Sequence, residues 1–283
     1  MAHTTIRVLP SEVTTFELFG QDIKAQPLNE SVRALTSLRF LSLVACRRLL
    51  ELPDWIGELQ SLEKIELSCA SLLKLPDAIG QLAKLTHLDL SNCCNLSRLP
   101  DTLGDLSSLT YLRLTSSGIT ALPASIGALT QLSELDMYCC LHFAELPDSI
   151  CDLPNLKEIE LSHTCIARLP DRFGDLKKLT CLALCYCGNL ATLPDSLGGL
   201  ESLEQLHLEG SAVVSLPASV ASLAKLAMLD LDRCDKLAAL PDAFSAMPGL
   251  AKVTLPAAVE IPASLRKHFR LKRVRLSAYP EDK

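Results

Sequence analysis

The segment "LTHLDLSNCCNLSRLPDTLGDL" (Leu85–Leu106) is one copy of a pattern that recurs along the chain. Its Leu-Pro dipeptide sets the register, and the proline recurs at positions 53, 76, 100, 123, 147, 170, 194, 217 and 241. The steps between these prolines alternate between 23 and 24 residues, so the unit of duplication is a 47-residue pair. A fixed period of this length is the sequence signature of a protein built from stacked repeats.

Each copy combines a short strand pattern with a turn. Leu88 and Leu90, with one residue between them, point to the same side of an extended strand and pack against neighbouring copies. The core is therefore continuous, and no repeat is expected to fold alone. Proline restricts φ and ends the strand side of each turn. We expect the following aspartates to be N-caps of helical turns: Asp54, Asp77, Asp101, Asp148, Asp171, Asp195 and Asp242.

These residues resemble the leucine-rich repeat family in its "LxxLxLxxCxxLxxLPxxIGxL" form, over about residues 28–276. The resemblance implies an α/β solenoid: a leucine-rich repeat horseshoe with a parallel β-sheet on the concave side and short helical turns on the convex side. We expect residues 1–34 to form an N-terminal cap with a degenerate repeat. Residues 35–261 then hold nine to ten repeats, and residues 262–283 form a basic C-terminal capping repeat and tail.

The two caps have their own patterns. "FELFG" (Phe16–Gly20) is expected to be a degenerate strand, and "LNESVRAL" (Leu28–Leu35) aligns with a repeat turn with Asn29 in the proline's place. At the far end, "IPASLRKHFRLKRVRL" (Ile261–Leu276) keeps the spacing, with His268 where a core leucine is expected. The basic residues there protect an exposed last strand against edge pairing. A docking surface for an acidic partner is the alternative.

Five of the twelve cysteines follow the 47-residue period: Cys46, Cys93, Cys140, Cys187 and Cys234. In the family this is a ladder position, whose side chain turns inward and bonds to the backbone of the adjacent turn. The shorter copies have Ala70, Ser117, Thr164 and Ser211 there. Because free cysteine is among the most buried residue types, we predict that these thiols are structural, buried and reduced.

The remaining cysteines lack that period. Cys151 replaces a turn glycine, and Cys181 and Cys185 are expected to face the concave side. Cys139 and His163 fall at equivalent points of successive copies, which leaves a shared metal ion as a weaker alternative. No tight CxxC pair of pairs supports that alternative, so we expect no metal site.

Composition narrows the function classes. The 283 residues have a formal net charge of −6, and no apolar run approaches the ~18–20 residues of a membrane helix. The first residues lack the pattern of a signal peptide. We therefore expect a cytoplasmic protein without disulfides, with delivery into a host cell as the alternative. We expect neither a membrane nor nucleic acid as partner.

Strand positions on the concave side are free to carry function because the core does not need them. Four carboxylates form a compact acidic block there, with tyrosines beside it and an arginine inside it. The candidate partner-binding residues are Glu66, Asp89, Tyr111, Arg113, Glu134, Asp136, Tyr138, Glu158, Glu160 and His207. This mixture is typical of protein interfaces and predicts a protein partner with a basic segment. A merely solvated polar face is the alternative.

The sequence does not favour catalysis. A general acid–base pair needs a walled, partly dry site, which an open sheet of regular repeats does not offer. No GxSxG, P-loop or HExxH pattern occurs. We therefore expect a non-enzymatic protein without a cofactor or a small-molecule substrate.

The copies look most like the repeat regions of plant intracellular immune receptors, plant Ras-group leucine-rich repeat proteins and effectors of plant-pathogenic bacteria. That resemblance implies protein binding in signalling or immunity. Two alternatives remain: the substrate-recognition arm of a larger ubiquitin-ligase effector, or the repeat region of an NLR-type immune receptor. A reading frame longer than 283 residues favours either of these.

Overall fold

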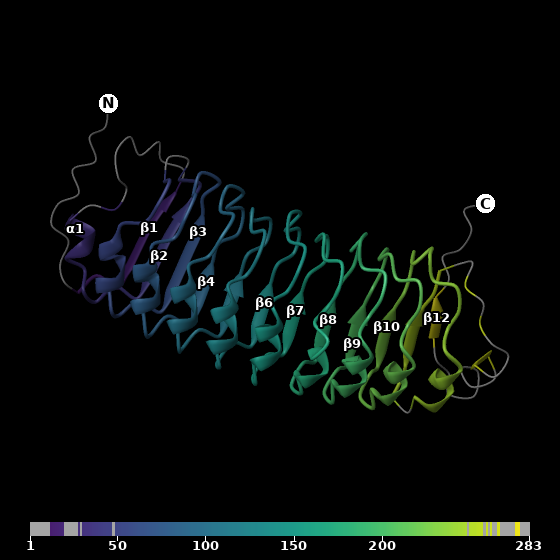
Figure 1. Ribbon diagram of the computed structural model, residues 1–283. Helices are drawn as coiled ribbons and strands as arrows, with labels where there is room; N and C mark the ends of the chain where they lie inside the picture. Colours follow the sequence, from purple (N-terminus) through teal and green to yellow (C-terminus); the bar gives the residue numbers. More distant parts are fainter. Residues whose placement is uncertain are drawn as a thin grey trace.

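The chain forms one solenoid in which a parallel sheet lines one face and short turns line the opposite face (Figure 1). This computed structural model describes residues 12–19, 28, 30–46, 49–247, 249–256, 259, 261, 265–266 and 275–277. Twelve strands of the described residues pair in sequence order, β1 to β12, and every pair is parallel. The predicted solenoid with a parallel sheet is confirmed.

The strands are short, and most contain only three residues. They are β1 (Thr15–Phe19), β2 (Phe40–Val44), β3 (Lys64–Ser68), β4 (His87–Asp89), β5 (Tyr111–Arg113), β6 (Glu134–Asp136), β7 (Glu158–Glu160), β8 (Cys181–Ala183), β9 (Gln205–His207), β10 (Met228–Asp230), β11 (Lys252–Thr254) and β12 (Arg275–Ser277).

On the opposite face, one α-helical turn is followed by nine 3₁₀ turns within the described residues. They are α1 (Glu30–Arg33), η1 (Asp54–Glu58), η2 (Asp77–Gln81), η3 (Asp101–Asp105), η4 (Ala124–Ala128), η5 (Asp148–Asp152), η6 (Phe173–Asp175), η7 (Asp195–Gly199), η8 (Ala218–Ser222) and η9 (Asp242–Ala246).

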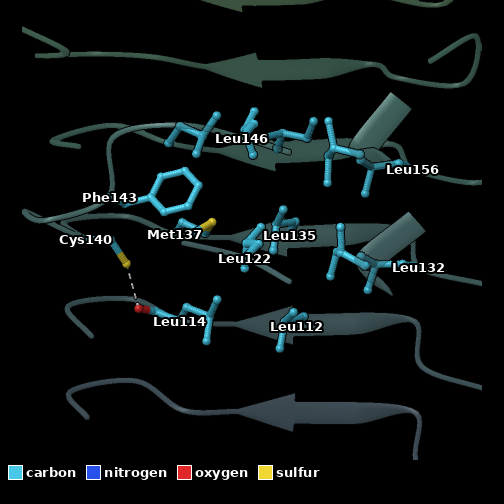
Figure 2. Close-up of a cluster of buried hydrophobic side chains, with 14 of the residues drawn as sticks. Leu112, Leu114, Leu122, Leu132, Leu135, Met137, Cys140, Phe143, Leu146 and Leu156 are labelled. Carbon is cyan, nitrogen blue, oxygen red and sulfur yellow. Dashed lines mark hydrogen bonds between the residues drawn. The ribbon is translucent and has the colours of Figure 1, made fainter. Parts of the chain in front are cut away.

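The core between the two faces is aliphatic and continuous. Figure 2 shows Leu112 and Leu114 of one repeat beside Leu135 and Met137 of the next, and all four are buried. Each such side chain removes apolar surface from water, which is worth about 1.5–3 kcal/mol per residue. Because that surface belongs to neighbouring repeats, the repeats stabilise one another.

The two ends of the solenoid agree in part with the capping elements expected from the sequence. The expected N-terminal strand is β1, which pairs with β2, and α1 takes the place of the first 3₁₀ turn. At the other end Leu265 is buried, and Leu276 of β12 lies beside Val253. Asn29, Pro262, His268, Leu271 and Val274 lie outside the described residues, as does most of the basic tail, so those expectations stay predictions.

The prediction that the aspartates are N-caps is wrong. Asp54 is the first residue of η1, and Pro53 occupies the N-cap position. The amide of Ile56 donates to the Pro53 carbonyl at 3.0 Å, which closes the i+3 turn. Within the described residues the carboxylates of Asp54, Asp77 and Asp101 accept no backbone hydrogen bond. They remain near the positive end of the turn, where a negative charge is favourable.

Glycine occupies most of the positions where successive turns approach each other closely. A Cβ atom on Gly104 would lie 2.5 Å from the carbonyl oxygen of Ser125 in the next turn. Cys151 occupies the equivalent glycine position, as predicted, and is buried. The turn after it, η6, is 3₁₀ only over Phe173–Asp175, two residues later than the pattern of the other turns.

The cysteine ladder is confirmed at most of its positions. The thiols of Cys93, Cys140 and Cys234 donate to main-chain carbonyls of the preceding repeat at 2.9–3.0 Å. Figure 2 draws the bond from Cys140 to the Leu114 carbonyl. Cys187 makes the same contact with Leu161 at 3.3 Å, and Cys46 lies 4.0 Å from the Leu18 carbonyl.

The ladder differs from expectation in the repeat that contains β3. Cys69 is buried and donates to the Leu43 carbonyl at 2.8 Å, whereas Ala70 is exposed. The expectation that Ala70 occupies the ladder position is therefore wrong. The residue after β2 and β4 that turns the chain with a positive φ, Ala45 or Asn92, has no counterpart with positive φ after β3, and there the inward position falls one residue earlier.

All twelve cysteines are free thiols. Burial raises the pKa of Cys93 to about 11 and that of Cys69 to about 12, because an ionised thiol is costly away from water. Cys94 and Cys165 are exposed. Since the thiolate is the reactive form, the ladder thiols are chemically protected by both access and ionisation.

Alkylation with iodoacetamide at pH 8, read by peptide mass spectrometry, tests this difference. Cys94 and Cys165 of the native protein should react while Cys93 does not. Raising the pH to 9 should leave Cys93 unmodified, because its pKa of about 11 keeps the buried thiol protonated at that pH. In concentrated urea all twelve should react. Equal native rates for Cys93 and Cys94 would contradict the ladder.

A pair of glycine substitutions tests the close approach of the turns. Gly104→Ala places a Cβ against Ser125 and should lower the free energy of unfolding by about 1–3 kcal/mol. Gly188→Ala is the matched control, because nothing lies within 4 Å of its added Cβ, and should change stability by less than about 0.5 kcal/mol. Urea denaturation measures both variants. Similar midpoints for the two variants would count against the packing argument.

Candidate protein-binding face

The sheet brings most of the predicted site residues into two rows. The first row runs across the strands in register as Glu66, Asp89, Arg113, Asp136, Glu160, Ala183 and His207. The second row contains Tyr111, Glu134 and Glu158 on adjacent strands. Neighbouring strands lie about 4.8 Å apart, so the predicted acidic block on β6 and β7 is a real cluster. His207 is separated from the block by Ala183 of β8.

The short strands create a backbone problem at their ends. The amide of His87 donates to the Glu63 carbonyl, and continuing this parallel pattern by four residues would pair the Ser91 amide with the Leu67 carbonyl. The next residue, Asn92, has φ of 60°, which turns the chain away. A buried amide or carbonyl without a partner is costly, so both groups need substitutes.

Two side chains of the same repeat supply those substitutes. The Asp89 carboxylate accepts the Ser91 amide at 2.8 Å, and the Cys93 thiol donates to the Leu67 carbonyl at 2.9 Å. The aspartate and the cysteine four residues later therefore replace one hydrogen bond of the sheet. This explains why both positions recur together along the chain.

The same device recurs one and three 47-residue units later. The Asp136 carboxylate accepts the Tyr138 amide, and the Cys140 thiol donates to the Leu114 carbonyl. In the later unit, the Asp230 carboxylate accepts the Asp232 amide, and the Cys234 thiol donates to the Leu208 carbonyl. The intervening unit has Ala183 instead of an aspartate, and there the Ser162 hydroxyl accepts the Cys185 amide at 3.0 Å. In a shorter repeat, Glu160 accepts the Ser162 amide at 2.6 Å.

Three of the predicted binding carboxylates thus hold the backbone. Asp89, Asp136 and Glu160 are half-buried and each accepts an amide hydrogen. Asp136 also pairs with Arg113, whose Nε lies 3.1 Å from Oδ2, and the same Nε contacts the Thr115 hydroxyl at 3.2 Å. Their hydrogen bonds to the backbone therefore explain why these carboxylates lie on the sheet face, and no binding partner is needed to account for them.

Glu134 and Glu158 differ from these residues. They lie side by side on β6 and β7, both are exposed, and neither has a hydrogen-bond or ion-pair partner among the described residues. Glu66 is paired with Lys64 at 2.7 Å. The His207 ring nitrogen Nε2 forms a hydrogen bond with Gln205 Oε1 of its own strand, at 3.2 Å. The carboxylates available to a partner are therefore the second-row pair.

The tyrosines also separate into two environments. Tyr111 is half-buried against the His87 ring, with centroids 5.7 Å apart, and burial raises the pKa of its hydroxyl. Tyr138 is 42% exposed and belongs to a different group. Its ring meets His163 at 5.3 Å with an interplanar angle of 74°, and His163 stacks on Tyr186 at 4.7 Å and 14°.

We call Tyr138, His163 and Tyr186 the aromatic row. The repeat alignment places Cys139 and His163 at equivalent positions of successive copies, and a shared metal ion was the alternative expected from that spacing. In the described part of the chain no group of three or more His, Cys, Asp or Glu side chains is arranged to hold a metal ion. His163 is occupied by ring contacts instead.

The class defined by this geometry is a solenoid of short parallel strands with leucine cores. A family model described as "Leucine-rich repeat region" matches residues 4–136 and 101–187. The chain therefore belongs to the leucine-rich repeat family, whose domains typically bind other proteins and are generally non-catalytic. No curated protein gives a significant match to the sequence. No helix of the described residues is long and apolar enough to cross a membrane.

Solved structures give the same fold. The leucine-rich repeat domain of the type III effector XopL is 27% identical, with a TM-score of 0.63, covering 87% of this chain and 77% of that one. The functional domain of InlJ from Listeria monocytogenes, described as including a cysteine ladder, is 21% identical with a TM-score of 0.62. That match covers 87% of this chain and 49% of InlJ, and it supports the fold alone.

Two alanine substitutions separate the structural carboxylates from the free ones. Asp136→Ala removes the acceptor of the Tyr138 amide and the partner of Arg113, and should lower the free energy of unfolding by about 1–3 kcal/mol. Glu134→Ala, on the same strand, should change it by less than about 0.5 kcal/mol. Urea denaturation measures both. Equal losses would contradict the division between the two rows.

Proposed function

We propose that the chain is a non-enzymatic intracellular binder that captures a basic segment of a protein on the sheet face of β5, β6 and β7. The observation that carries the proposal is the pair Glu134 and Glu158, exposed, adjacent and without a partner in the described residues. The sequence expectation of a basic partner is kept, and its contact point moves from the four-carboxylate block to this pair.

Charge complementarity supports a basic rather than a neutral partner. The sheet-facing positions of β6 and β7 are Glu134, Asp136, Tyr138, Glu158, Glu160 and Ser162, which include no lysine or arginine. The arginine on the sheet face of β5, Arg113, is paired with Asp136. Two like charges on neighbouring strands repel each other, and a cation between them removes that repulsion. Complementary charges of this kind also raise the rate of association and suppress wrong partners.

The compartment and the biological setting rest on two further supports. Twelve free thiols, several at ladder positions, suit a reducing compartment, where thiols persist. The likeness to the repeat domain of a type III effector supports an effector-type or immunity-related role for this chain, with the sheet face as the recognition surface.

Fluorescence anisotropy with a labelled lysine peptide, (Gly-Ser-Lys)₃, tests the contact point. Glu134→Gln/Glu158→Gln should weaken binding about ten-fold, because two exposed pairs are lost at up to about 1 kcal/mol each. Glutamine keeps the size of the side chain and removes only the charge.

The matched control is Asp101→Asn/Asp105→Asn, which removes the same charge from the exposed residues of η3 on the opposite face. This variant should bind within about two-fold of the unmodified protein, because charges beyond a Debye length are largely screened at 0.15 M salt. Equal weakening in the two variants would mean attraction to net charge alone and would reject the proposed face.

A further inference from the structure

The aromatic row is held in one arrangement by the repeats around it. The Tyr186 hydroxyl donates to the Glu209 carboxylate, and Arg233 Nη1 donates to the same hydroxyl at 3.4 Å. Gly210 of the next repeat has φ of 65°, and a Cβ there would lie 2.6 Å from the Tyr186 ring. The absence of a side chain at position 210 therefore makes room for the ring.

Two of the three residues of the row occupy an unfavourable backbone position. His163 and Tyr186 have φ of 59° and 56°, in the left-handed region that asparagine and glycine accept most readily. Asn92 and Gly210 hold the equivalent positions of two other repeats. A bulky ring there costs about 1 kcal/mol or more, so the local fold alone does not favour two of them in succession.

Tyr138 is the more exposed end of the row, at 42% against 36% for Tyr186, and the end that lies beside the carboxylates of β6 and β7. It follows Asp136 on the same chain segment, and the carbonyl of Ser162, two residues after Glu160, accepts the Cys139 amide at 2.9 Å. Glu160 uses Oε1 for the Ser162 amide, and a carboxylate has further acceptor sites. A cation placed on the Tyr138 ring would therefore lie close to carboxylate oxygens.

We infer that Tyr138 receives an arginine side chain of the partner, with the guanidinium stacked on the ring and paired with Glu160. This inference rests on the proposed function, since it names the residue that the basic segment presents. Arginine fits better than lysine because its planar, weakly hydrated guanidinium stacks on aromatic faces and pairs with carboxylates at the same time. The fixed row lowers the entropic cost of that contact.

Three labelled peptides and two variants at Tyr138 test the inference by anisotropy. The peptides are (Gly-Ser-Arg)₃ and its lysine and citrulline counterparts, so that charge and planarity are separated. The arginine peptide should bind about five-fold more tightly than the lysine peptide, and the citrulline peptide should bind weakly. Tyr138→Leu should remove the preference for arginine, and Tyr138→Phe should retain most of it because the ring remains.

The outcomes distinguish this inference from the proposed function. If arginine and lysine peptides bind equally and Tyr138→Leu has no effect, while Glu134→Gln/Glu158→Gln still weakens both, the inference fails and the proposed face stands. If neither set of variants weakens binding, both fail. Loss of the preference in Tyr138→Phe as well would place the contact on the hydroxyl and would also overturn the stacking. Circular dichroism of each variant checks that the fold is unchanged.

Discussion

The structure depends on satisfying the backbone where three-residue strands end. A parallel sheet pairs each strand with both neighbours, yet the chain turns away after residues such as Asp89. The Ser91 amide and the Leu67 carbonyl therefore do not form the hydrogen bond that a longer strand would make between them. Buried groups of this kind cost about 1–3 kcal/mol each when left without partners. The carboxylate and the thiol four residues apart provide the partners, and this lets the repeats remain short and closely stacked.

That constraint changes how the sheet face should be interpreted. A carboxylate on an open face suggests a binding residue, but Asp136 and Glu160 each accept a hydrogen bond from a backbone amide two residues later in the chain. What remains for a partner is smaller and better defined: Glu134, Glu158, the exposed ring of Tyr138 and the acceptor sites of Glu160 that the Ser162 amide does not use. The recognition surface is thus the part of the sheet face that the backbone does not use.

Much of the architecture was predictable from the sequence because it follows from spacing. The Leu-Pro period and the paired leucines determine the parallel sheet, its order and the buried cysteines. The errors arose where a one-residue difference decides the outcome. Cys69 replaces Ala70 in the ladder where the chain after β3 lacks the residue with positive φ that follows β2 and β4. Pro53 rather than Asp54 precedes η1 because a 3₁₀ turn closes on the proline carbonyl.

The candidate site was predictable only as a set of residues. The register places Glu134 beside Glu158, as the repeat alignment expects, but sequence alone does not tell which carboxylates accept backbone amides. The ring contacts of His163 also depend on three-dimensional packing, because Gly210 must leave space for Tyr186. The signal for these carboxylates in the sequence is the recurrence of Asp89, Asp136 and Asp230, each four residues before a cysteine of the 47-residue period.

Amide hydrogen exchange by NMR tests the central claim most directly, that carboxylates replace missing hydrogen bonds of the sheet. The amides of Ser91, Tyr138, Ser162 and Asp232 should be protected in the native protein, although none donates to a neighbouring strand. In Asp136→Ala the Tyr138 amide should lose that protection while the Ser91 amide keeps it. Rapid exchange at all four amides of the unmodified protein, or unchanged protection of Tyr138 in the variant, would contradict the account.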